Sequence, residues 1–155
     1  MKVIAIISAV LALTACGTGQ AVNQGQAVKP PTNDEVMALF DRWNDALGTR
    51  DPATVANQYA PDAVLLPTVA GHIHDTRQEI TEYFTEFLKL APRGTFLEHE
   101  VRVLDPDAAV LSGLYDFAIT RNGVPETVHA RATFVFERRS GTWSIVEHHS
   151  SKVPV

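Results

Sequence analysis

The feature that most constrains this chain is a change in hydrophobic period near residue 95. Before that point, large apolar residues recur every three or four positions, as at Val36, Leu39, Trp43 and Leu47. After it, apolar and polar residues alternate, as in residues 97–103. A period near 3.6 indicates amphipathic helices, and a period of two indicates half-buried strands. The chain therefore predicts helices first and a sheet afterwards, which is an α+β fold.

Three helices are expected before the change of period. The first begins after Thr32, a typical N-cap residue, and ends at Gly48. The second is short and begins at Asp51-Pro52, and it extends far enough to include Tyr59. The third begins where Thr76 and Glu79 have the spacing of a capping box. Tyr83 lies in this third helix, and we expect both tyrosines to be core aromatics with their hydroxyls at the rim.

A short strand is expected over residues 64–67, between the second and third helices. Four antiparallel strands follow, separated by turn sequences at residues 105–107, 121–123 and 140–141. We expect the helices to cover one face of a curved antiparallel sheet, which gives a cone. The open end of such a cone could admit a small ligand.

The N-terminal residues predict export. Residues 1–15 combine Lys2 with an apolar run, as in a secretory signal peptide. The run ends in Leu-Thr-Ala before Cys16, which resembles the bacterial lipobox; the alternative is an ordinary signal peptide cleaved near Ala15. Lipidation of Cys16 would explain why an exported chain carries one cysteine. We expect a lipoprotein signal peptide over 1–15, a flexible tether over 16–31 and a domain over 32–155, lipid-anchored in the bacterial cell envelope.

Composition narrows the classes of function. The 155 residues suit one domain. The formal net charge is −5 and no basic stripe is present, so we expect no nucleic-acid partner, and membrane contact through the lipid anchor only. The sequence has no Ser-His-Asp spacing, phosphate-binding glycine loop or Cys-x-x-Cys motif, so it offers no nucleophile, and we expect no cofactor.

Two neighbouring histidines give the first candidate site. His148 and His149 lie on one expected strand and so point to opposite faces of the sheet. One should enter the cone beside Phe134, as a proton-transfer group or as a hydrogen-bonded structural side chain. The other should share the outer face with Arg131, which would lie opposite His149 if the turn at Gly141 has three residues.

Arg131, Tyr115 and Asp116 complete the candidates. Arg131 could bind a carboxylate ligand, or form ion pairs within or between subunits. Tyr115 and Asp116 also point to opposite faces, and either could take part in proton transfer. The alternative for Asp116 is exposure to solvent, or a pair with Arg131 at a subunit contact.

His72, His74 and Asp75 form a set of side chains that can bind transition metals. The segment has the composition of a loop, and no third ligand is established by spacing. We therefore expect a polar surface loop near the mouth of the cone, and no metal site.

The ordered set of C-terminal motifs gives a resemblance to known proteins. It comprises Ala130-Arg131-x-x-Phe134, Gly141-x-Trp143-x-Ile145, residues 148–151 (His-His-Ser-Ser) and Pro154. Together with residues 43–68 and 77–88, this set resembles the nuclear transport factor 2-like superfamily. More closely it is similar to the bacterial SnoaL-like group related to the association domain of calcium/calmodulin-dependent protein kinase II.

The resemblance implies a cone-shaped cystatin-like fold and a homo-oligomer, either a dimer or a larger ring. It also implies a pocket, which in the kinase domain takes small carboxylates and in other members of the superfamily serves isomerases, dehydratases and cyclases. The kinase domain's pocket arginines fall at Phe134 and Ser150 here, so this chain departs from the family at both positions.

These observations predict an exported lipoprotein whose SnoaL-like domain dimerises and binds a small organic ligand in its cone. The ligand contacts would come from Arg131, His148, His149 and Tyr115. One alternative is an enzyme of the isomerase or lyase type that uses His148 or His149 with Tyr115 or Asp116. Another is a structural oligomerisation module. The sequence leaves open whether the protein is an enzyme.

Overall fold

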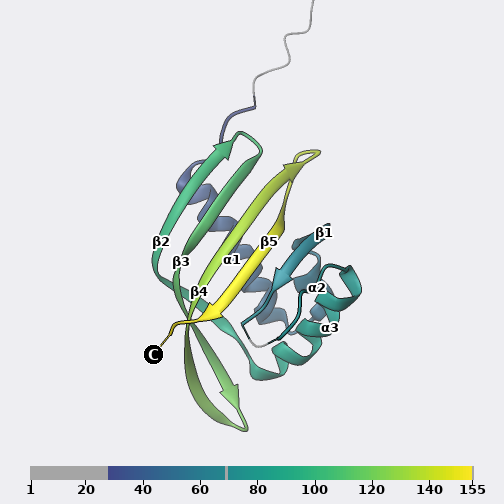
Figure 1. Ribbon diagram of the computed structural model, residues 1–155, viewed down its shortest axis with the longest axis vertical. Helices are drawn as coiled ribbons and strands as arrows, with labels where there is room; N and C mark the ends of the chain where they lie inside the picture. The colour runs from purple at the N-terminus through teal and green to yellow at the C-terminus, as the bar shows by residue number, and fades with distance from the viewer. Residues whose placement is uncertain (1–27, 69, 155) are drawn as a thin grey trace, which may run out of the picture.

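The structure, a computed structural model, describes residues 28–68 and 70–154. The expected signal peptide, Cys16 and most of the expected tether lie outside the described residues. The elements are α1 (Asn33–Thr49), α2 (Pro52–Ala56), β1 (Tyr59–Leu66), α3 (Arg77–Phe87), the 3-10 turn η1 (Leu88–Leu90), β2 (Arg93–Asp105), β3 (Ala108–Arg121), β4 (Val124–Arg139) and β5 (Thr142–Lys152). This order confirms the α+β prediction (Figure 1).

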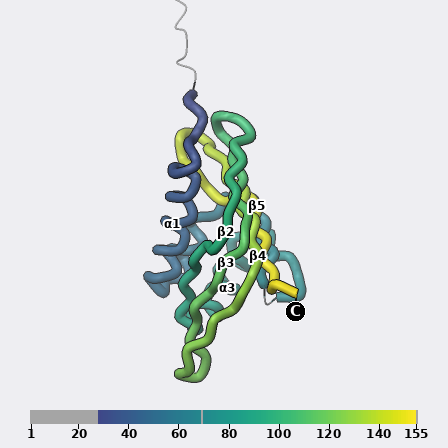
Figure 2. Tube along the Cα trace, turned by 90° about the vertical axis from the view of Figure 1, so that its left-hand side faces the viewer, coloured from purple at the N-terminus to yellow at the C-terminus, as the bar shows by residue number. Residues whose placement is uncertain are grey.

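The strands form one curved sheet in the order β1-β5-β4-β3-β2. β2 to β5 are antiparallel neighbours, and β1 runs parallel to β5 along the edge. Figure 2 shows α1 lying along one side of this sheet. We call that side the inner face and the side turned away from α1 the outer face. Among the described residues, no helix is long and apolar enough to cross a membrane.

Two capping boxes set the starts of the longer helices. The Thr32 hydroxyl accepts a hydrogen bond from the Glu35 backbone N–H, and the Glu35 carboxylate accepts one from the Thr32 N–H at 2.7 Å. The same reciprocal pair joins Thr76 and Glu79 at α3. Each box satisfies backbone donors that the first turn of a helix leaves unpaired. The predicted N-termini of both helices are therefore confirmed.

The first helix ends one residue later than predicted. Gly48 lies inside α1, and the helix is capped by Arg50, which has φ of 62° and donates its backbone N–H to the Leu47 carbonyl. The Arg50 guanidinium also donates to the Leu88 carbonyl at 3.0 Å, a tertiary contact that local spacing cannot reveal. At Gly48, a Cβ would lie 2.8 Å from an Arg93 nitrogen, so the glycine makes room for that side chain.

The second helix is shorter, and the first strand longer, than expected. α2 ends at Ala56, and Tyr59 begins β1 instead of ending the helix. The strand starts early because it pairs with β5, where Tyr59 lies opposite Ile145 and the Ile145 N–H donates to the Gln58 carbonyl. Pairing with a strand more than 80 residues away outweighs a weak local helical preference.

The β4–β5 hairpin has a different register from the one expected. Its loop is two residues long, with φ of 51° at Ser140 and 82° at Gly141, and a bulge interrupts the pairing after Val135. Arg131 therefore lies opposite Ser151 and not opposite His149. A shift of two residues keeps every side chain on its face, whereas a shift of one would invert them. For this reason, Arg131 and His149 still share the outer face, as predicted.

The hydrophobic core lies between the helices and the inner face. Its largest fully buried side chains include Trp43 from α1, Phe84 from α3, Tyr115 from β3 and Phe134 and Phe136 from β4. The Trp43 and Phe134 rings meet edge to face at 5.2 Å between centroids. Aromatic residues bury large apolar areas and favour such tilted contacts. The cone is consequently filled largely by rings.

Candidate functional site

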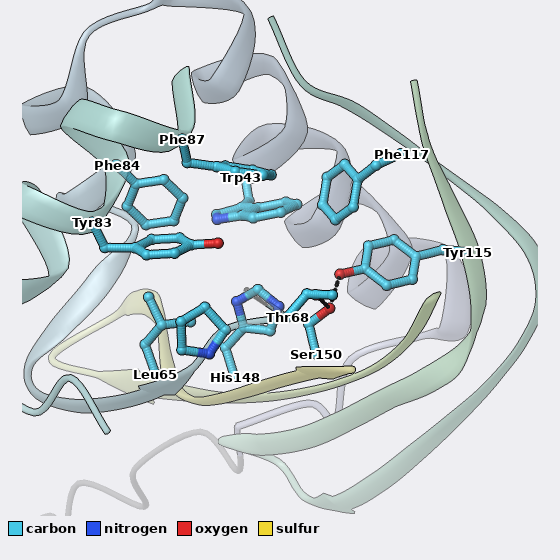
Figure 3. A pocket seen from close by; sticks show the side chains of 11 residues that line it. Trp43, Leu65, Thr68, Tyr83, Phe84, Phe87, Tyr115, Phe117, His148 and Ser150 are labelled. Atoms are coloured by element: carbon cyan, nitrogen blue, oxygen red, sulfur yellow. Dashed lines mark hydrogen bonds between the residues drawn. The ribbon is translucent and has the colours of Figure 1, made fainter. Parts of the chain in front are cut away.

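A small cavity remains inside the cone, where α3 faces β3 and β5. Its volume is ≈ 10 Å³. That is about the smallest space that holds one water molecule. Its walls are mostly aromatic and aliphatic, and the lining residues are Trp43, Leu65, Pro67, Thr68, Tyr83, Phe84, Phe87, Tyr115, Phe117, His148 and Ser150 (Figure 3).

His148 is the most unusual polar group in this cavity. The side chain is 3% exposed, and its ring stacks on Phe134 with 3.9 Å between centroids. Its Nδ1 atom lies 2.8 Å from the Tyr59 hydroxyl, which accepts a hydrogen bond from Trp43 Nε1 at 3.1 Å. Its Nε2 atom is buried and has no hydrogen-bond partner among the described residues. A buried imidazole nitrogen without a protein partner is uncommon and calls for a water or ligand atom.

Burial sets the charge of His148. Removal from water disfavours the imidazolium, and His149 next to it adds a smaller effect of the same sign, so that the pKa of His148 falls to about 3. The ring is therefore neutral at physiological pH. Burial likewise raises the pKa of Tyr59, Tyr83 and Tyr115. The cavity is lined by uncharged groups throughout.

A second set of polar groups lines the cavity beside His148. The Tyr115 hydroxyl is 2.6 Å from the Ser150 Oγ atom, which also contacts the Thr68 hydroxyl. Figure 3 shows the Tyr83 hydroxyl pointing toward the space between Trp43 and His148. The site thus offers hydroxyl and imidazole groups in an otherwise apolar pocket. That is the usual composition of a small-molecule site.

The predicted site residues separate into two groups. His148 and Tyr115 line the cavity. His149, Asp116 and Arg131 belong to the outer face, so they do not meet the cavity residues. Asp116 pairs with His129 at 2.7 Å, and not with Arg131 as one alternative proposed. Arg131 donates to the Ser151 hydroxyl at 3.2 Å.

The outer face has its own pattern of charge. On neighbouring strands, Leu114 of β3 lies between Glu98 of β2 and Arg131 of β4. Neither Glu98 nor Arg131 forms a salt bridge within the described part of the chain. A hollow of ≈ 380 Å³ includes all three residues. The strands come very close here: a Cβ on Gly113 would lie 2.0 Å from the Glu98 carbonyl oxygen, so only glycine fits.

The His72–His74 segment does not assemble a metal site. The two rings lie 4.4 Å apart, but within residues 28–68 and 70–154 no three His, Cys, Asp or Glu side chains group around a point where a metal ion could sit. The expected exposed loop is only half right, because His74 is 6% exposed and its backbone pairs with Leu65. Burial is the main reason that the pKa of His74 is lowered.

Sequence reasoning missed several residues around His148. Trp43 was expected only as a core aromatic. The Tyr59 hydroxyl was expected at the rim, which is wrong, because it is buried between Trp43 Nε1 and His148 Nδ1 and helps to orient the histidine. No spacing rule joins them, because they come from α1 and β1 while His148 lies on β5. A signal did exist for Phe134 and Ser150, the two positions where the resemblance expected arginines. Phe134 stacks on His148, Ser150 lines the same cavity, and neither side chain carries a charge.

Helices over one face of a curved sheet are the fold that solved structures share under the names nuclear transport factor 2-like and cystatin-like. The chain belongs to the calcium/calmodulin-dependent protein kinase II association domain family, whose model matches residues 32–154. This confirms the resemblance inferred from the motifs. A search of curated proteins found no match.

Solved structures agree with this assignment. A calcium/calmodulin-dependent protein kinase II association domain protein from Xanthomonas campestris is 47% identical, with a TM-score of 0.78 over 83% of this chain and 94% of that chain. The hub homology domain of the same kinase from Chlamydomonas reinhardtii is 26% identical, with a TM-score of 0.66 over 78% of this chain and 97% of that one. A Streptomyces avermitilis protein described as a dehydratase shares the fold at 16% identity, with a TM-score of 0.67 over 79% and 97% of the two chains.

Proposed function

We propose that this protein is an association module whose copies form a homodimer, or a larger assembly, through the outer face of the sheet. The observation that carries the proposal is the row Glu98–Leu114–Arg131 across three adjacent strands. Membership of the association domain family supports it. Two copies packed face to face, with a two-fold axis along β3 at Leu114, would bring each Glu98 opposite Arg131 of the partner subunit. Such self-complementarity is what an isologous interface requires.

The outer face also has the apolar centre that an interface needs. Leu114 is 39% exposed, and neighbouring Leu97 is 64% exposed at the bulge in β2. Exposed leucines surrounded by unpaired charges favour association over solvation, since the core of an interface is apolar and its rim polar. A filled cone fits this role, because the core then serves chiefly to hold the outer face in shape.

Sedimentation equilibrium of residues 28–155, which contain every described helix and strand, tests the proposal. We expect a dimer or larger species for the parent chain, and at least tenfold weaker association for Arg131→Glu or Glu98→Arg alone, since opposed like charges cost several kcal/mol. The double exchange should restore association. Lys89→Glu on the helical side makes the same charge change as Arg131→Glu and serves as its control. A monomer at tens of micromolar would overturn the proposal.

We further propose that the domain is carried at the cell envelope by lipid attached to Cys16. The sequence of residues 1–16 supports this location. When the full chain is expressed in bacteria supplied with labelled palmitate, the label should enter the protein, and the protein should partition into detergent. Cys16→Ser, which removes the one cysteine, should abolish both results. Unchanged labelling of that variant would disprove the anchor.

A second candidate function is binding of a small molecule beside His148. One observation favours it: His148 lines the cavity, and its Nε2 atom is buried and has no hydrogen-bond partner among the described residues. Binding fits better than isomerase or lyase chemistry, because Asp116 and His149 lie on the other face. A neutral His148 with a pKa of about 3 is also a weak base at physiological pH. A screen of small organic molecules that follows the fluorescence of Trp43 tests this function, with His148→Leu as the control. If the screen finds no ligand, the result would favour the association role alone.

A further inference from the structure

We propose that Trp43 and Tyr59 are positioning residues that hold His148 as a hydrogen-bond donor toward the cavity, and that the cavity's ligand is an uncharged molecule with a carbonyl oxygen. This inference rests on the second candidate function above. It adds a direction to the hydrogen bonds in the cone and a chemical class for the ligand.

The direction follows from the donors that each group possesses. Trp43 Nε1 can only donate, so the Tyr59 oxygen accepts its hydrogen at 3.1 Å. The Tyr59 hydrogen then has His148 Nδ1 as its acceptor at 2.8 Å. An Nδ1 atom that accepts a hydrogen bond carries no proton, and in a neutral imidazole the proton is then on Nε2.

The opposite arrangement is unfavourable in this core. If Nδ1 carried the proton, both Trp43 and His148 would donate to the Tyr59 oxygen. The Tyr59 hydrogen would then need another acceptor, and this hydroxyl has no third hydrogen-bond partner in the part of the chain that the structure describes. Tyr59 is 2% exposed, so water does not supply one from bulk solvent. A buried donor left unpaired is costly, which favours the arrangement with hydrogen on Nε2.

The walls of the cavity specify the ligand's charge. The Nε2–H group of His148 needs an acceptor, and the Tyr83 hydroxyl points into the same space. No lysine or arginine lines the cavity among the described residues. A carboxylate entering here would lose its hydration without gaining a counter-ion, which is a large cost. A carbonyl oxygen accepts the same hydrogen bond with a far smaller loss of hydration.

The size of the cavity indicates how a ligand enters. At ≈ 10 Å³, the space accepts one water-sized group, such as the ligand's oxygen atom. The remaining atoms need the rings of Tyr83 and Phe87, both half-buried on α3, to turn aside. His148 itself stays in place, because it is stacked on Phe134 and bonded to Tyr59.

The first test reads the protonation of each ring nitrogen. Residues 28–155 labelled with ¹⁵N-histidine give a long-range ¹H–¹⁵N spectrum at pH 7, in which the two tautomers have distinct patterns. We expect hydrogen on Nε2 of His148 in the parent protein, and a mixture of tautomers in Tyr59→Phe. Exposed His149 provides an internal reference for an unconstrained ring. A parent protein with hydrogen on Nδ1 would overturn the positioning role.

The second test compares butanone with propionate, which have equal numbers of heavy atoms but differ in charge. Each is titrated while the His148 Nε2 and Trp43 Nε1 signals are followed. We expect butanone to bind at least tenfold more tightly. His148→Gln, which keeps an N–H donor, should bind within about threefold of the parent, and His148→Leu should lose about tenfold, as for a lost hydrogen bond. Tyr59→Phe should lose about threefold or more.

The outcomes separate the parts of the proposal. Equal binding of propionate would overturn the ligand class while leaving the site in place. Saturating amounts of both probes without a shift of either signal would overturn the ligand class and the second candidate function together. Equal butanone affinity for His148→Leu and His148→Gln would show that the donor is not used. The dimerisation proposal is untouched by all of these results, since it concerns the other face of the sheet.

Discussion

His148 and His149 are neighbours on β5, yet they lie in opposite environments. His148 is 3% exposed, neutral and bonded to Tyr59, whereas His149 is on the exposed outer face. The same contrast runs along β3 and β4, because side chains of a strand alternate between the faces. The inner face is close-packed and aromatic, whereas the outer face carries Glu98 and Arg131 on either side of Leu114. The two proposals follow this division, with assembly through the outer face and ligand binding in the cone.

The comparison is tested most strongly by two leucines of β3. Leu111 is fully buried on the inner face, and Leu114 is 39% exposed on the outer face. We expect Leu111→Ala to lower the free energy of unfolding by about 2–5 kcal/mol, because it leaves a cavity in a packed core. Leu114→Ala should change the stability of the monomer by less than about 1 kcal/mol, while weakening association. Urea denaturation, at protein concentrations below the dissociation constant of the dimer, measures the free energy of unfolding of both variants. Equal losses of stability would contradict the difference between the faces.

The next largest effect is the loss of stability in acid that the burial of His148 causes. The unfolded chain protonates His148 near its ordinary pKa of 6.5, while the folded chain resists protonation until about pH 3. His148 therefore makes the folded state less stable as pH falls below 6.5, with the full effect reached near pH 3. Between pH 6.5 and 4 this amounts to about 3 kcal/mol. The curve of stability against pH should be flatter in His148→Phe by that amount, and equal slopes for the parent and this variant would contradict a buried, neutral His148.

The smallest effect is expected for the ion pair on the outer face. Asp116 and His129 are 2.7 Å apart, with side-chain exposures of 23% and 69%. Exposed pairs contribute little, so Asp116→Asn should cost less than about 1 kcal/mol. Thermal unfolding of this variant beside Tyr59→Phe gives the comparison, since the latter leaves two buried groups unpaired and should cost about 2–4 kcal/mol. A larger loss of stability for Asp116→Asn than for Tyr59→Phe would contradict this expectation and show that the outer-face pair stabilises the fold.

Periodicity and capping motifs were sufficient to predict most of the fold. The capping boxes at Thr32 and Thr76 and the alternation after residue 95 gave the order of elements, because each depends on contacts within a few residues. The same alternation separated His148 from His149 and Tyr115 from Asp116, but only the structure shows that His148 and Tyr115 share the inner face. Errors occurred at Arg50, at Tyr59 and in the pairing of Arg131, where distant segments decide the outcome.

Chemistry inside the cone was beyond prediction for a physical reason. The sequence specifies which side chains are apolar and how they alternate, and from this follow the helices, the sheet and the two faces. It does not specify that Trp43, Tyr59 and His148, from three separate elements, meet in one hydrogen-bonded chain. Only tertiary packing brings them together and excludes water, and the exclusion of water makes the histidine neutral and leaves its Nε2 atom unpartnered.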